Sequence, residues 1–336
     1  MARIKVTAAI QPAYQHMVRM LFRPFNLKKW LALGFVSLLA GSAGGGPGGR
    51  FPCGSSEPNT REIDQALQWM AAHWGIIAAA GAIFVILLFV LYWLGSIFRL
   101  VYTEQVAKDS YAIKEPFARL KNLGTSLFLW LAGFGFAFIA AAGILVGLPV
   151  GLAFGLNAAG WVQVVAAAWG VIAFLAILLI FIIVNIFAIE LVSGVMYTRG
   201  VRVLEAWRLL LPRLKENIGQ TALYLLLIFA FCIGLAILSI FAAFIVLMVM
   251  LIPFGGVFLL AALIGKSAGL VWNAATISIA AFYGAIFFAA YIYVFSCILQ
   301  PAVVFLRAFS LAVLGQMDES FATVPTGLEP LLQNEQ

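Results

Sequence analysis

Few side chains in this sequence could do acid–base or nucleophilic chemistry, and their spacing brings none of them together. The chain has two histidines, His16 and His73, and the apolar segment between them places these residues on opposite sides of a predicted membrane. No HExxH pattern occurs, and Cys53, Cys232 and Cys297 lack the spacing of a metal or redox site. We therefore expect no catalytic residue, no metal site and no cofactor.

Glu190 is the most notable polar residue, because it ends a stretch without charge that begins at Asn122. A charged side chain at the centre of a membrane helix costs roughly 2.5–3.5 kcal/mol, so residues of this kind are often functional. At the end of a span the side chain instead reaches the interface, where Arg199 or Arg202 would pair with it. We favour this pairing over a proton or substrate site.

Other polar candidates lie in or beside apolar segments. Asn185 is five residues deeper than Glu190, and a hydrogen bond between Asn185 and Asn273 would join two helices. Such bonds contribute on average less than about 1 kcal/mol, so we expect them to stabilise helix packing. Gln300, followed by Pro301, ends the last long apolar segment and mirrors the region of Glu190.

Four glycines recur at intervals of four residues: Gly143, Gly147, Gly151 and Gly155. This spacing places bare backbone along one face of a helix, where another helix can approach closely. Pro149 lies inside the stripe and is expected to kink the helix. We favour packing within the chain as its role, and a dimer face or a substrate crevice is the alternative.

The elements that position these residues are apolar helices. Of 336 residues, 64% are hydrophobic and 10% are charged, against about 25% charged in a typical soluble domain. This composition excludes a soluble globular protein, a disordered chain and a collagen-like rod. We predict an all-α polytopic integral membrane protein, a helical bundle of about six transmembrane helices. The predicted spans cover residues 30–43, 74–98, 123–150, 161–189, 219–245 and 270–299.

The segments outside these spans also have expected roles. Residues 8–22 and 202–215 place apolar side chains on one helical face, which is typical of interfacial amphipathic helices. We divide the chain into a cytoplasmic amphipathic segment (1–29), a single transmembrane domain (30–310) with a glycine-rich external loop (44–73), and a mobile C-terminal tail (311–336).

Two alternatives concern the number of crossings. The first span has 14 residues, which reach about 21 Å as a helix, whereas the hydrocarbon core is roughly 30 Å thick. It resembles a cleavable signal peptide with a small-residue site at 41–43, although we favour a retained span. The stretch 256–265 after Pro253 is expected to be re-entrant or interfacial, or else part of a seventh crossing that starts near residue 244.

The charge distribution orients the predicted spans. The chain has 20 basic and 13 acidic residues, and 17 of the basic residues lie in segments 1–29, 99–121 and 199–215 or at Arg307. Basic connectors face the cytoplasm, so both termini are expected there, in the inner (cytoplasmic) membrane of the cell. Anionic lipid headgroups on that side would attract these residues, and the net charge of +7 therefore requires no nucleic acid.

One segment supports a resemblance. Residues 21–35 read LFRPFNLKKWLALGF, and a glycine-rich loop and paired spans with basic connectors follow. This arrangement resembles uncharacterised prokaryotic multi-pass membrane proteins, which are loosely similar to the membrane domain fused to some glycerophosphodiester phosphodiesterases. The resemblance implies a membrane fold and no established activity. The phosphodiesterase barrel has no counterpart, since no region is long and polar enough to form it.

We expect the protein to be a non-enzymatic scaffold or a subunit of a transport or envelope complex, because packing features are strong and catalytic groups are absent. Its partner would be another membrane protein or a second copy of the chain. The alternative is a small-molecule or lipid permease, which the glycine stripe and the proline breaks at residues 149 and 253 favour. An intramembrane enzyme is the least favoured hypothesis.

Overall fold

The computed structural model describes residues 5–41, 71–267 and 274–324, and every regular element in these ranges is helical. This confirms the predicted all-α fold. The 3₁₀-helices are η1 (Val6–Ala9) and η4 (Glu319–Phe321), and the π-helices are η2 (Gly143–Gly147) and η3 (Ala188–Val192). The α-helices are α1 (Ile10–Phe22), α2 (Leu27–Leu39), α4 (Trp74–Lys108), α5 (Lys114–Ala142), α6 (Leu148–Gly155), α7 (Gly160–Phe187), α8 (Ser193–Arg199), α9 (Val203–Glu216), α10 (Ile218–Ser267), α11 (Ala274–Ile298) and α12 (Gln300–Met317).

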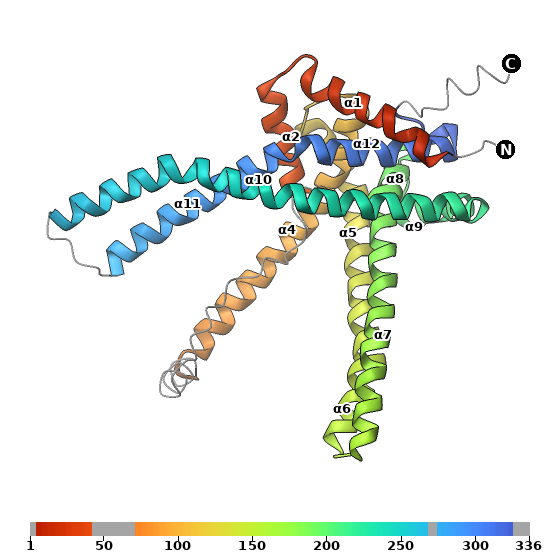
Figure 1. The fold of residues 1–336 in the computed structure, drawn as a ribbon, viewed down its shortest axis with the longest axis horizontal. Coiled ribbons are helices and arrows are strands. Elements are labelled where there is room, and N and C mark those ends of the chain that lie inside the picture. The colour runs from red at the N-terminus through yellow and green to blue at the C-terminus, as the bar shows by residue number, and fades with distance from the viewer. Residues whose placement is uncertain (1–4, 42–70, 268–273, 325–336) are drawn as a thin grey trace.

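The helices form a central hub from which helical arms extend in different directions (Figure 1). The hub contains α1, α2, α8, α9 and α12, together with the inner ends of α4, α5, α7 and α10. One arm is the outer part of α4, another is the pair of α5 and α7 joined through α6, and the last is the outer part of α10 with α11. The core of the protein therefore lies in the hub, and the arms are largely exposed.

Helix α12 is the centre of the hub. It contacts α1, α2, α4, α8, α10 and α11, and its side chains from Ala308 to Leu314 are fully buried. Our predicted tail began at residue 311, so the structure moves this boundary beyond Met317. Because α12 is buried in protein, it can be short and can carry a charge such as Arg307. Its hydropathy therefore resembles that of a segment outside the membrane spans.

Helix α2 replaces the predicted first span. It has 13 residues and is about 20 Å long, which is too short for a hydrocarbon core of roughly 30 Å. It packs instead on α4 and α11, where Gly34 lies against Cys297. Six described helical stretches are long and apolar enough to cross a membrane, as expected in number, but α12 is among them and α2 is not.

The two predicted amphipathic helices form as α1 and α9. The apolar face of α1 packs on α12, and Ala13, Met20 and Leu21 are buried there. The apolar face of α9 packs on α5, α8 and η3. Protein thus covers much of both faces, and contact of these helices with a membrane surface stays a prediction.

Two of the predicted chain breaks have different outcomes. The turn expected within residues 151–160 is confirmed, since α6 ends at Gly155 and α7 begins at Gly160. The break expected at Pro253 is wrong, because α10, a helix of 50 residues, runs through this proline to Ser267. The stretch 256–265 therefore belongs to α10 and forms neither a re-entrant segment nor the end of a separate crossing. A proline in an apolar helix removes one backbone hydrogen bond without ending the helix.

Candidate functional site

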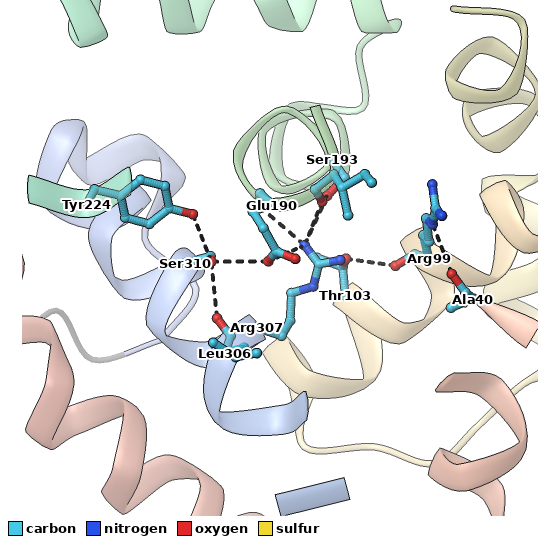
Figure 2. Close-up of polar contacts among 10 residues, drawn as sticks. Ala40, Arg99, Thr103, Glu190, Ser193, Tyr224, Leu306, Arg307 and Ser310 are labelled. Carbon is cyan, nitrogen blue, oxygen red and sulfur yellow. Dashed lines mark hydrogen bonds and ion pairs between the residues drawn. The ribbon is translucent and has the colours of Figure 1, made fainter. Parts of the chain in front are cut away.

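Glu190 lies in the π-helix η3, at the point where the arm formed by α7 enters the hub. Its carboxylate is 3.5 Å from Nη1 of Arg307 on α12 and accepts a hydrogen bond of 3.1 Å from Oγ of Ser310. Figure 2 shows the carboxylate between these two side chains. The side chain of Glu190 is 23% exposed and that of Arg307 is 4% exposed, so the pair is largely withdrawn from solvent.

The π-helix explains how a buried arginine is accommodated. A π-turn shifts the backbone hydrogen-bond register, so carbonyl groups near it can accept other donors. Nη1 of Arg307 donates to the carbonyl oxygens of Ile189 at 2.9 Å and Glu190 at 3.3 Å, and to Oγ of Ser193 at 3.1 Å. The guanidinium is therefore held by neutral oxygens as well as by the carboxylate of Glu190.

The expected pairing of Glu190 with Arg199 or Arg202 is wrong. Arg199 instead donates to Ser320 and lies over the ring of Phe321, 5.2 Å from its centroid. Arg202 is the residue before the first turn of α9. The partner of Glu190 is distant in sequence because tertiary packing brings α12 against η3. In the sequence, the feature that points to Arg307 as the partner is its single charge inside an apolar stretch.

A hydroxyl pair extends the cluster to α10. Oγ of Ser310 lies 3.0 Å from the phenol oxygen of Tyr224, and Tyr224 is fully buried. Neither residue was among the candidates from sequence. Glu190, Ser310 and Tyr224 thus join η3, α12 and α10 through consecutive polar contacts (Figure 2).

A second arginine lies on the other side of Arg307. Nε of Arg99, on α4, donates to the carbonyl oxygen of Ala40 at 2.9 Å, and Thr103 donates to the carbonyl oxygen of Arg99 (Figure 2). Nη1 of Arg99 is buried and has no hydrogen-bond partner among the described residues. Arg99 connects α4 to the end of α2.

Gln300 forms a separate buried cluster at the start of α12. Its amide nitrogen donates to Oγ of Ser37 at 2.5 Å and to the carbonyl oxygen of Ser296 at 3.1 Å. Its amide oxygen accepts a hydrogen bond of 3.3 Å from Tyr102. Gln300 therefore joins α2, α4, α11 and α12, and it resembles the region of Glu190 in cross-linking helices.

The other polar candidates are less connected. Nδ2 of Asn185 donates to the carbonyl oxygen of Phe181 in its own helix, at 2.9 Å. Asn273 lies outside the described residues, so the expected bond between the two asparagines is not tested. Asn185 thus makes a local hydrogen bond and no described contact with the cluster of Glu190.

The four glycines of the stripe lie in η2 and α6 with open space around them. A Cβ at Gly143, Gly151 or Gly155 would meet no described atom within 4 Å, and one at Gly147 would meet only the carbonyl oxygen of Ala142, at 4.0 Å. Helix α7 packs on this segment through Val146 and Val150, which approach Gly170. The close approaches that glycine permits occur elsewhere, at Gly34, Gly95, Gly124, Gly170 and Gly194.

The arrangement cross-links helices through one ion pair and several hydrogen bonds. The cluster of Figure 2 holds one carboxylate, and that carboxylate is engaged by Arg307 and Ser310. Among residues 5–41, 71–267 and 274–324, no group of three His, Cys, Asp or Glu side chains could hold a metal ion. The described contacts of this cluster join η3, α12 and α10 through ion pairing and hydrogen bonds.

Comparison with known proteins gives one family. The sequence model of a family of unknown function (DUF7544) matches residues 4–324, which include both the hub and the arms. No curated protein and no solved structure matches the chain. The expected similarity to membrane domains of glycerophosphodiester phosphodiesterases is not shown.

Proposed function

Since the chain belongs to this family of unknown function, we propose its role from its geometry, as a non-enzymatic scaffold or subunit of a membrane complex. The observation that carries the proposal is the contrast between a cross-linked hub and arms that the described protein leaves uncovered. A rigid hub would hold the arms in place, and the arms would bind lipid and partner proteins.

The hub has the contacts that a rigid element needs. The buried Arg307 and Gln300 and the half-buried Glu190 join helices, and further ion pairs lie toward the outside of the hub. Glu104 pairs with Lys108 and Arg119. Buried polar networks of this kind favour one arrangement of helices, since breaking any member leaves polar groups unsatisfied.

The arms have the opposite character. Every residue from Trp74 to Tyr92 on α4 is exposed, and Ile83 and Phe84 retain 68% and 59% of their accessible surface. A large uncovered apolar surface marks a site of contact with lipid or with another protein. Lipid tails can cover an apolar surface without any protein partner. A specific contact between two helices in a membrane needs close van der Waals packing with the partner helix.

The hub is proposed to face the cytoplasm. The backbone N–H of Lys5 donates to Oε1 of Gln316 at 3.1 Å, so the beginning and the end of the described chain meet in the hub. An even number of crossings would produce this arrangement, and the basic connectors then face the cytoplasm and anionic headgroups. A reporter fused after Gln336 should read as cytoplasmic, and an external signal would refute this orientation.

Co-purification tests the proposed function. The full chain is extracted in a mild detergent and exchanged into lipid nanodiscs. The mass of the resulting particle is measured by light scattering and native mass spectrometry. We expect a homo-oligomer or a stable complex with a second membrane protein. A monomer without a protein partner, under conditions that preserve other complexes of the same membrane, would contradict the proposal.

A further inference from the structure

A groove of about 910 Å³ lies between α5 and the first turns of α9, at the edge of the hub. Polar side chains of Asn122, Thr125 and Ser126 line its α5 wall, and Arg202, Glu205 and Arg208 line its α9 wall. None of these residues takes part in the cluster around Glu190 and Arg307. The groove is therefore a second feature with its own chemistry.

The charged lining of the groove is suited to an anion. Arg202 and Arg208 are exposed, and Glu205 is the one acidic side chain in the lining. Helix α9 has 14 residues, and the side chain of its N-cap residue, Arg202, makes no capping hydrogen bond. The backbone N–H of Val203 donates to Oγ of Ser126 at 3.4 Å, and the remaining first-turn N–H groups and the helix dipole favour a bound negative charge. Two arginines and one glutamate give the lining a net positive charge.

The groove also has apolar lining on α5. Leu129 and Trp130 belong to it, and Leu129 retains 64% of its accessible surface. The apolar surface continues along the α5 arm through Phe136 and Ile139, which are similarly exposed. Tryptophan is typical of the level where a membrane changes from headgroups to hydrocarbon. The groove thus combines cationic side chains with apolar surface that suits an acyl chain.

We propose that this groove binds one anionic phospholipid. Its phosphate lies between Arg202, Arg208 and the N-terminus of α9, and an acyl chain lies along Leu129 and Trp130. The apolar lining distinguishes a lipid from free phosphate, which would use the arginines and the helix N-terminus alone. The inference rests on the proposed function in one respect, since a lipid bound here would hold the hub at the membrane surface.

Native mass spectrometry of the full chain with added phosphatidylglycerol or phosphatidylcholine tests the site. We expect the chain to retain phosphatidylglycerol preferentially, and Arg202→Gln with Arg208→Gln to weaken this binding on the order of tenfold. The matched control is Lys215→Gln with Arg19→Gln, which removes the same charge at exposed positions outside the groove. Inorganic phosphate should not displace the lipid.

Equal losses in the groove and control variants would refute a defined site, as would unchanged binding in the groove variant or displacement by phosphate. Leu129→Gln keeps both arginines and should also weaken lipid retention, which a purely ionic site would not show. The mass of the oligomer or complex is measured in the same samples. If the unmodified chain shows no preference for phosphatidylglycerol while its complex is intact, this inference alone is overturned. If the unmodified chain forms no oligomer or complex, the proposed function is overturned.

Discussion

The pairing of Glu190 with Arg307 illustrates what a buried ion pair does in this protein. Arg307 is almost fully buried, and the carboxylate of Glu190 supplies the one negative charge in the cluster of Figure 2. Such a pair adds little net stability compared with apolar residues of similar volume, but the loss of one partner leaves an uncompensated charge. Its effect is to specify how η3 packs on α12.

Arg307→Met should therefore destabilise the hub by about 3–5 kcal/mol, because the charge of Glu190 loses its counterion. Combining it with Glu190→Gln should restore much of the lost stability. The free energy of unfolding in detergent, followed by helix content, measures both effects. Arg19→Met, at an exposed position outside the groove, is the control and should change little. Identical losses in the single and double variants would show that the two charges are not coupled.

Gln300 and Asn185 should respond differently to the same substitution. Gln300→Leu leaves the buried hydroxyls of Ser37 and Tyr102 without their amide partner and should cost about 1–3 kcal/mol. Asn185→Leu removes a hydrogen bond within one helix and should cost less than about 1 kcal/mol. Thermal unfolding of the two variants compares them. A larger loss for Asn185 would contradict the assigned contacts.

Asp318 gives the hub a defined dependence on pH. Hydrogen bonds from the Ser320 hydroxyl and backbone N–H, and the ion pair with Arg213, lower the pKa of this carboxyl. A carboxyl with a lower pKa when folded stabilises the protein above its unfolded pKa, about 3.9, and the contribution is lost as pH falls through the folded pKa. Asp318→Asn should reduce this acid sensitivity in unfolding measured from pH 6 to about pH 3. An unchanged profile would contradict it.

At the scale of the element, the sequence predicts the long apolar helices well and the hub poorly. Uncharged stretches such as 122–189 leave few alternatives to membrane helices, and their turn at 156–159 follows from small residues. Helix α12 has the hydropathy of a flanking segment because it is buried in protein rather than in lipid. Hydropathy does not distinguish these two environments for an 18-residue helix.

The same limit applies to the site. Glu190 can be identified from the sequence, because the energetic cost of a charge beside an apolar stretch depends only on that residue and its neighbours in the chain. Its partner, Arg307, follows from the packing of α12 on η3, which no local pattern encodes. Nearby arginines such as Arg199 were favoured because short sequence separation suggests proximity. Contacts between elements far apart in the chain require the tertiary arrangement.

The glycines provide a test at this scale. A Cβ at Gly124 would lie 2.6 Å from Cα of Ile97, whereas a Cβ at Gly151 would meet no described atom within 4 Å. Gly124→Ala should therefore destabilise the protein by about 1–3 kcal/mol through overpacking. Gly151→Ala should be neutral or stabilise it by up to about 1 kcal/mol through helix propensity. Thermal unfolding of both variants measures the difference in stability. Equal destabilisation would show that a helix packs closely against the glycine stripe, contrary to this account.

At the scale of the whole molecule, the contrast between hub and arms carries the functional account. The hub joins the ends of several helices through buried polar contacts, and the arms present apolar surface over most of their length (Figure 1). A protein built only to hold itself in a membrane needs no defined arrangement of separate arms. The proposed scaffold uses this arrangement to place contacts for partner proteins around a fixed centre.

Site-specific photo-crosslinking in intact cells tests this claim most directly. A photoreactive residue replaces Ile83 or Phe84 on the α4 arm, or Ile279 on α11, and Tyr14 on the hub surface serves as the comparison, since all four side chains are exposed. The account predicts that at least one arm position crosslinks to a defined protein, either a second copy or one recurring partner. Crosslinks to lipid alone at every arm position would contradict it.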